Sequence, residues 1–309
     1  MITSVTEVPL AVGESLVIPR NRFGSGMKDE KRICIVTGTH GDELEGQYVA
    51  WKLASILRSK PGHLRGTVDI YPAINPLGIC TMSRGMPQVD LDLNRIFPGN
   101  PNGNMSEYVT SRIVDDIKGA DCCIDIHASN IFLREIPQVR ININTAERLV
   151  PLARLLNMDF VWIHAAATVL ESTLAHSLNS IGTPTLVVEM GIGNRITTTY
   201  GDRLIAGILA LMQSFGMWDL PVSPVAPPIE STDGCVSFIN APCAGMFFAT
   251  SEHTSYVEEG EKIGIVADPL SGEIKAELTS PVSGLLFTLR EYPVVYEGSL
   301  IARILGGNA

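Results

Sequence analysis

The feature that most constrains the fold is an alternation of short apolar runs and amphipathic helical patterns from residue 33 to about residue 220. The apolar runs have no polar side that could face solvent, which is typical of parallel strands covered on both faces. We therefore predict an α/β fold with a mixed, largely parallel sheet and helices on both faces. The expected strands are 33–36, 68–74, 122–126, 139–143, 160–163 and 185–188, and the expected helices are 45–59, 106–118, 145–157, 172–180 and 200–215.

A proline-rich stretch, residues 221–229, ends this alternation and is interpreted as a linker, because proline cannot continue a helix. Residues 1–220 would then form one domain and residues 230–309 a second. The second part contains two related segments, which begin at Ala241 and Ser280. This duplication predicts a small all-β, barrel-sandwich-like domain. It is similar to biotinyl and lipoyl carriers but lacks their modified lysine at the central turn, so we expect a structural or pocket-shaping module.

A glycine-rich turn, residues 37–46, connects the first apolar run to the first helical pattern. His40 and Glu43 are three residues apart in this turn, so their side chains can converge on one divalent metal ion. His127 ends another apolar run, at the kind of strand end where chemistry collects in such sheets. Two His and one Glu, with a position left for water, form a ligand set of catalytic zinc. The other histidines, His63, His164, His176 and His253, are expected to be ordinary core or surface residues.

Several short motifs follow one another in a characteristic order along the chain. They are residues 38–43 (GTHGDE), Asn75-Pro76, Arg84, residues 92–99 (DLNRIFPG), residues 125–127 (DIH) and residues 188–191 (VEMG). Together they resemble the succinylglutamate desuccinylase/aspartoacylase family of the zinc carboxypeptidase superfamily. The resemblance covers roughly residues 33–191, and the trailing β-rich part also looks like that of bacterial deacylases of this group. It implies a zinc carboxypeptidase-like fold and a zinc-dependent hydrolase acting on amide bonds.

The resemblance assigns the metal ligands and the general base. His40, Glu43 and His127 would hold one Zn²⁺ per chain. Glu189 follows the apolar run 185–188 and would take a proton from the attacking water and pass it to the leaving nitrogen. Zinc lowers the pKa of its water to about 7 and polarises the carbonyl, which a poor electrophile such as an amide needs. A buried carboxylate without such a task would be costly.

The resemblance also assigns the groups around the metal. Arg84 would stabilise the tetrahedral oxyanion. Asn94 and Arg95 would bind a substrate carboxylate, for which a guanidinium fork is suited. Asp92 would hydrogen-bond a ligand imidazole and set its tautomer. The spacing gives Asp125 separately: it lies two residues before His127 on an expected strand, so it either contacts that imidazole or is an ordinary acid at a strand end.

Four functions remain open. The leading one is a zinc-dependent deacylase that removes an acyl group from a small N-acyl amino acid or related amine. A zinc carboxypeptidase acting on short peptides is the nearest alternative, because it uses the same zinc and water. A catalytically inactive zinc- or ligand-binding protein would not need the carboxylate at Glu189. A scaffold protein would leave the convergence of the strand ends unexplained.

Charge and cysteine content limit the partners and the compartment. A formal charge of -10 argues against nucleic acid or an anionic membrane as a partner. The sequence contains no run of about 18 apolar residues, so we expect no membrane span. A small anionic N-acylated substrate remains compatible, because a few arginines can set the field of a pocket. The six cysteines form no C-x-x-C pair and suggest reduced thiols in a cytoplasmic protein. The oligomeric state stays open, with a homo-oligomer among the alternatives.

Overall fold

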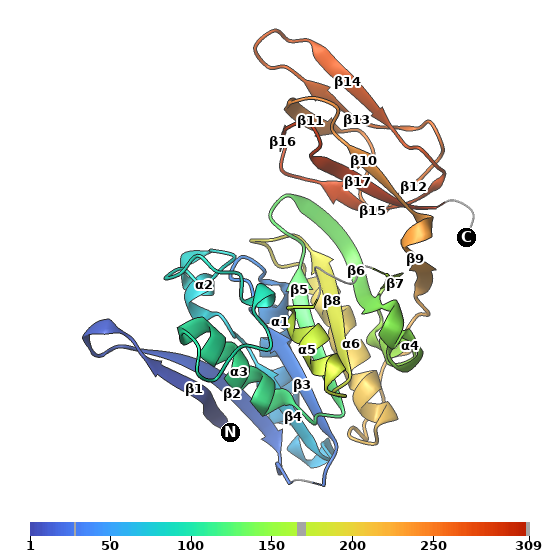
Figure 1. Cartoon of the computed structure of the whole chain (residues 1–309). Helices are drawn as coiled ribbons and strands as arrows, with labels where there is room; N and C mark the ends of the chain where they lie inside the picture. The colour runs from blue at the N-terminus through green and yellow to red at the C-terminus, as the bar shows by residue number, and fades with distance from the viewer. Residues whose placement is uncertain (28, 166–170, 307–309) are drawn as a thin grey trace.

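The computed structural model describes residues 1–27, 29–165 and 171–306, and its main element is a large twisted sheet (Figure 1). The strands of the α/β part are β1 (Ile2–Pro9), β2 (Ser15–Gly24), β3 (Arg32–Thr37), β4 (Thr67–Tyr71), β5 (Cys122–Ala128), β6 (Leu133–Asn142), β7 (Phe160–His164), β8 (Thr185–Gly191) and β9 (Ile229–Thr232). The order along the sheet is β1-β2-β4-β3-β5-β8-β6, and the central strands β4, β3, β5 and β8 are parallel. The predicted mixed, largely parallel sheet is confirmed.

Helices cover both faces of this sheet, as predicted. The helices are α1 (Glu45–Ser59), α2 (Pro76–Thr81), α3 (Met105–Ile117), α4 (Ala146–Ala153), α5 (Leu174–Ser180) and α6 (Thr198–Ser214). Helices α1, α4 and α6 pack on one face and share a core with Ile124 and Ile126 of β5, whereas α3 and α5 pack with Cys123 on the other face. This alternation within β5 follows from the two-residue period of a strand. Within the described residues, no helix is both long and apolar enough to cross a bilayer.

The largest differences from the predicted ranges are at the start of β6 and at the end of the helix expected over 145–157. Strand β6 begins at Leu133, six residues before the predicted start at residue 139. Its first half is not a continuous apolar run and contains Pro137, so the apolar pattern used for the prediction did not include it. The register shifts between Glu135 and Gln138, so the proline lies in an irregularity where its missing N–H is tolerated. The helix expected over 145–157 ends at Ala153 and continues as a single 3-10 turn.

The C-terminal part consists of two packed antiparallel sheets at one end of the molecule (Figure 1). Its strands are β10 (Val236–Asn240), β11 (Gly245–Ala249), β12 (Tyr256–Val257), β13 (Lys262–Ala267), β14 (Ile274–Thr279), β15 (Gly284–Arg290), β16 (Val294–Val295) and β17 (Leu300–Gly306). Strands β11, β13, β14 and β16 form the second sheet, and β15 pairs with β6 and so joins the rest to the main sheet. The predicted all-β character is confirmed. The domain division at residues 220 and 230 stays a prediction.

Candidate metal centre and adjoining cavity

A tight turn between β3 and α1 carries His40 and Glu43. The turn needs glycine at Gly41, because a Cβ atom there would lie 2.0 Å from the backbone of Gly78. Gly38 has a φ of +67°, in the left-handed region that favours glycine. The turn therefore presses against the start of α2, and both side chains are directed back over the carboxyl end of the sheet.

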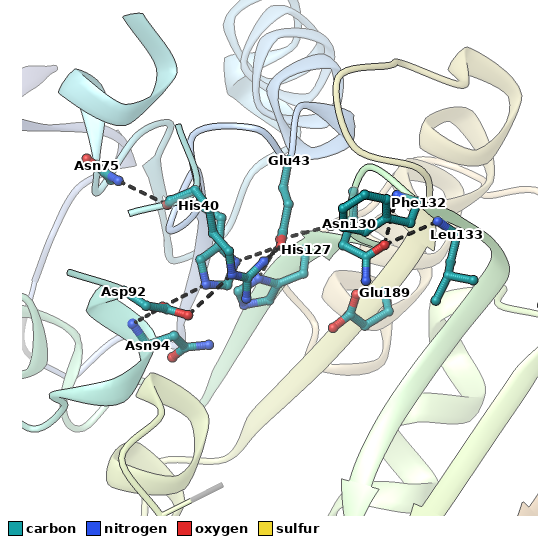
Figure 2. A network of polar contacts seen from close by, with 12 residues as sticks. His40, Glu43, Asn75, Asp92, Asn94, His127, Asn130, Phe132, Leu133 and Glu189 are labelled. Carbon is teal, nitrogen blue, oxygen red and sulfur yellow. Dashed lines mark hydrogen bonds and ion pairs between the residues drawn. The ribbon is translucent and has the colours of Figure 1, made fainter. Parts of the chain in front are cut away.

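The structure brings His40, Glu43 and His127 together, and all three side chains are buried (Figure 2). Nδ1 of His40 lies 2.7 Å from Oε1 of Glu43, and Nδ1 of His127 lies 2.9 Å from Oε2 of the same carboxylate. One atom from each residue can be chosen so that all three lie within 4.8 Å of one another. The triplet thus offers two imidazoles and one carboxylate to a common point.

The hydrogen bonding around the triplet fits a bound cation. His40 Nδ1 is buried and has no hydrogen-bond partner, although the Glu43 oxygen is close to it. A buried lone pair and a carboxylate oxygen in this relation are satisfied when both face one cation. The opposite ring nitrogens face acids: His40 Nε2 lies 2.9 Å from Asp92 Oδ1, and His127 Nε2 lies 3.1 Å from Asp125 Oδ2. Such acids hold an imidazole in the tautomer that leaves Nδ1 for a metal.

The electrostatics keep the carboxylates charged. Burial opposes ionisation of Glu43, but His40 and His127 outweigh it and lower the pKa of the Glu43 carboxyl. Burial likewise opposes ionisation of Asp92, and the hydrogen bond from His40 together with Arg84 lowers its pKa. Burial would lower the pKa of His127, whereas Asp125 and Glu43 raise it well above its usual range. The carboxylates of Glu43, Asp92 and Asp125 thus surround the two imidazoles, and such acidic surroundings suit a cation.

The two predicted arginines lie beside the triplet but are paired differently. Arg84 donates from Nη1 to Glu43 Oε1 at 2.8 Å, and its Nε lies 3.3 Å from Asp92 Oδ2. Arg95 is about half exposed, and its nearest carboxylate oxygen, on Asp92, is 4.0 Å away. Its guanidinium is therefore the more accessible of the two.

The predicted substrate-binding residue Asn94 also serves the fold. Asn94 is buried, and its carboxamide oxygen accepts a hydrogen bond from the backbone N–H of Leu174 at 2.9 Å. This contact pins the first residue of α5 beside the metal centre. The amide nitrogen of Asn94 would therefore be the atom that donates to a substrate carboxylate.

Glu189 lies on the strand next to His127, and its carboxylate faces the same side of the sheet (Figure 2). His127 and Glu189 are direct neighbours in the parallel pairing of β5 with β8. Arg140 of β6 is the nearest cation, with Nη1 at 3.4 Å from Glu189 Oε1. Burial raises the pKa of the Glu189 carboxyl to about 7, although Arg140 opposes the shift. A carboxylate with a pKa near neutrality can both accept and release a proton.

A cavity of about 640 Å³ extends from the triplet along the sheet. Thr185, Val187 and Glu189 of β8 line it, whereas Leu186 and Val188 between them belong to the core on the opposite face. Short helix α5 covers this part of the sheet, and the space beneath it stays open. Four residues of a strand span ~13 Å, so the cavity reaches about that far from Glu189 to Thr185.

The cavity wall contains most of the predicted site residues. Those lining it are His40, Glu43, Arg84, Asn94, Arg95, Asp125, His127 and Glu189, whereas Asp92 lies behind His40. Two histidines that the sequence placed among ordinary residues, His164 and His176, also line the cavity.

Four charged wall residues were missed by the sequence analysis: Glu135, Arg140, Glu171 and Arg303. Glu135 and Arg140 lie in β6 together with Arg134, whereas Arg303 is the single charged residue in 300–306. That lone charge in an apolar strand is the signal that could have identified Arg303.

Comparison with known families gives one match. The family described as "Succinylglutamate desuccinylase/Aspartoacylase catalytic domain" matches residues 29–215, which is more than half of the chain. A curated protein of Halomonas elongata, N-alpha-acetyl-L-2,4-diaminobutyric acid deacetylase, is 34% identical over 103 residues. That alignment covers 32% of this chain and 29% of the deacetylase, so the chain matches less than a third of this relative's length.

Solved structures share the whole architecture. A succinylglutamate desuccinylase from Silicibacter superposes with a TM-score of 0.86 at 20% identity, covering 98% of this chain and 94% of that one. The product-bound ectoine utilization protein EutE from Ruegeria pomeroyi gives 0.84 at 19% identity, covering 98% and 93%. A succinylglutamate desuccinylase/aspartoacylase from Rhodobacter sphaeroides gives 0.83 at 22% identity, covering 100% and 96%. At these identities the likeness is one of fold, and it includes the C-terminal β-strands.

Proposed function

This chain belongs to the succinylglutamate desuccinylase/aspartoacylase family, and we propose that it is a zinc-dependent amide hydrolase that removes an acyl group from a small N-acylated amino acid or related amine. The observation that carries the proposal is the juxtaposition of the His40, Glu43 and His127 triplet with Glu189 at the mouth of one cavity. A protein that only bound a metal would not need a further carboxylate, outside the ligand triplet, at that place.

His40, Glu43 and His127 are the residues that would hold the zinc ion. When bound, the ion supplies a Lewis acid that acidifies water and polarises the scissile carbonyl. Asp92 and Asp125 keep the two imidazoles in position through their contacts at 2.9 and 3.1 Å. A positive ion at the triplet would also lower the pKa of Glu189 below its value in the metal-free protein, which favours the carboxylate form.

Glu189 would accept a proton from the attacking water and deliver it to the leaving nitrogen. Its position next to His127 in the sheet places it beside the metal centre without making it a ligand of the triplet. Arg84 lies on the opposite side of Glu43 and would donate to the oxyanion that develops from the carbonyl. Losing one such donor costs about 2.7–4 kcal/mol of transition-state stabilisation.

Arg95 would bind the substrate carboxylate, assisted by the amide nitrogen of Asn94. Its accessible guanidinium is suited to a bidentate contact with such a group. The relative from Halomonas is named for an N-acetylated diamino acid, which supports N-acyl amino acids as the first substrates to test.

A carboxypeptidase acting on short peptides is the second candidate, and the length of the cavity favours it. The cavity of about 640 Å³ continues along β8 beyond the reach of an acetylated amino acid. Neutral residues such as Thr185 and Val187 line this extension and could accommodate a longer amide.

The metal site is tested by elemental analysis of purified protein, which should contain about one zinc per chain. His40→Ala should lose both the metal and the activity, because it removes a buried ligand. His63→Ala is a matched control, since His63 lies outside the cavity and pairs with Asp219 at the surface. Metal-free wild type that still hydrolyses its substrate would contradict the mechanism.

The substrate class is tested by a hydrolysis screen of acetyl, succinyl and formyl amino acids together with short peptides. Hydrolysis of N-acyl amino acids alone would support the deacylase. Hydrolysis of peptides alone would support the second candidate. A zinc-loaded protein that cleaves none of these amides would contradict both enzyme functions.

A further inference from the structure

A chain of partly buried ionic contacts leads from the last strand of the C-terminal part to Glu189. It begins at Arg303 of β17, passes through Glu135 and Arg140 of β6, and ends at the Glu189 carboxylate. The strand pairing explains why these residues meet: Glu135 lies opposite Thr288 of β15, and Thr288 lies opposite Arg303. The contact between Glu135 and Arg303 thus crosses an intervening strand.

Glu135 is the centre of this chain. Its side chain is 1% exposed, so an unpaired charge there would be strongly unfavourable. Arg303 donates to Oε1, whereas Arg140 and Gln138 both donate to Oε2 at 2.7 Å. The register shift between Glu135 and Gln138 lets two side chains three residues apart meet on the same face of β6, which a regular strand would not allow.

Trp162 supports both guanidinium groups from the neighbouring strand β7. The centre of its ring system lies 5.5 Å from the guanidinium carbon of Arg140 and 5.6 Å from that of Arg303. The indole itself is held by a hydrogen bond from Nε1 to Asp233 at 2.8 Å. The two arginines therefore share one fixed aromatic platform and one carboxylate.

Arg140 contacts its two carboxylates unequally. Nη2 donates to Glu135 at 2.7 Å, whereas Nη1 stays 3.4 Å from Glu189. The tighter contact fixes the guanidinium on the Glu135 side and leaves only a loose ion pair with Glu189. A general base benefits from this arrangement, because it is oriented by a nearby charge without being fully engaged by it.

We propose that Glu135 and Arg303 are positioning residues that hold Arg140 beside Glu189, so that the C-terminal β-strands set the geometry of the proposed general base. This inference rests on the proposed function. It gives the C-terminal part a defined task within the same site. A shared core supports this arrangement, because it joins β6 and β7 to β15 and β17; its members include Ile136, Phe160, Phe287 and Leu305.

The kinetic test compares three variants of the zinc-loaded, full-length protein. Arg303→Met should lower kcat between about 10-fold and 100-fold, as a displacement near 1 Å at a reacting group does. KM should change less than about threefold, because the role assigned to Arg303 acts through Glu135 and Arg140 and includes no contact with the substrate. Arg303→Lys should recover a large part of kcat, since it restores the charge next to Glu135.

Arg290→Met is the matched control. Arg290 lies on the adjacent strand β15, but its guanidinium donates to the backbone carbonyls of Tyr292, Val294 and Leu300 within the C-terminal part. Its loss should weaken the same module while leaving kcat near the wild-type value. An equal fall of kcat in this control and in Arg303→Met would show a general structural effect and would overturn the proposal.

A structural test does not depend on turnover. Crystal structures of metal-free wild type and Arg303→Met should show the Arg140 guanidinium displaced relative to Glu189 in the variant. An unchanged distance between Arg140 Nη1 and Glu189 Oε1 would overturn the positioning role even if kcat falls. The inference can fail without the proposed function. This is the case if wild type and Arg303→Met are fully active whereas Glu189→Gln is inactive.

Discussion

Two buried carboxylates in this protein are each surrounded by arginines, and their surroundings differ in one respect. Asp69 on β4 is fully buried and receives Arg22 at 2.6 Å, Arg32 at 3.0 Å and Arg20 at 3.8 Å. Glu135 on β6 is buried to a similar degree and receives Arg140 and Arg303. Both clusters tie together strands that are distant in sequence.

The Asp69 cluster has no residue in the cavity wall, and we call it the closed cluster. The Glu135 cluster, in contrast, has residues that line the cavity. Arg20 also contacts Thr3 of β1 and Asp116 of α3, and Asp116 accepts a hydrogen bond from Tyr71. These contacts of the cluster are therefore with other residues of the protein's framework. In the part of the chain that the structure describes, none of these residues lines the cavity. Arg140, in contrast, reaches Glu189. A buried ion cluster is thus expected to affect chemistry only where one of its members contacts a reacting group.

The largest expected effect on kcat is that of a substitution at Glu189. Among the residues that the structure describes, the closed cluster contacts none with such a role in the proposed reaction. Glu189→Gln should lower kcat by about 10²–10⁴-fold, because the amide cannot accept the proton. Zinc content and melting temperature should stay close to those of the wild type, since the triplet remains intact. Steady-state kinetics together with elemental analysis measures both. An unchanged kcat would remove Glu189 from the role of general base.

A substitution in the closed cluster should lower the free energy of unfolding rather than kcat. Asp69→Asn leaves three arginines without their shared carboxylate and should cost about 3–5 kcal/mol in the free energy of unfolding. Urea denaturation measures this loss as a lower midpoint. The kcat per folded molecule should be that of the wild type. A large fall in kcat with normal stability would mean that the two clusters do not differ as described.

The smallest expected effect is a pH dependence of stability in the metal-free protein. The folded-state pKa of Glu189 is raised to about 7, so the folded protein holds this proton more tightly than the unfolded chain does. The stabilisation from the protonated form is present at low pH and is lost as the pH rises from about 4.5 to about 7. The melting temperature of the wild type should therefore fall relative to that of Glu189→Gln over this interval. Parallel pH profiles of the two proteins would contradict the raised pKa.

The sequence by itself determined the architecture and the first half of the metal centre. Apolar runs without a polar side required a sheet covered on both faces, and the structure confirms this arrangement. His40 and Glu43 meet because they are three residues apart in one glycine-lined turn, which is a local property of the chain. His127 was predicted from its place at the end of an apolar run and Glu189 from the order of the motifs, and the structure brings both to the same place.

Only the tertiary structure decided how distant strands meet. The register of β6 against β15 and of β15 against β17 brings Arg303 to Glu135 across 168 residues of sequence. The irregularity between Glu135 and Gln138 then places both side chains on one face, against the ordinary period of a strand. The spacing of residues in a sequence shows which way a side chain points from its own element. Which element it faces depends on strand pairing and on local bulges, because these follow from packing of the whole chain.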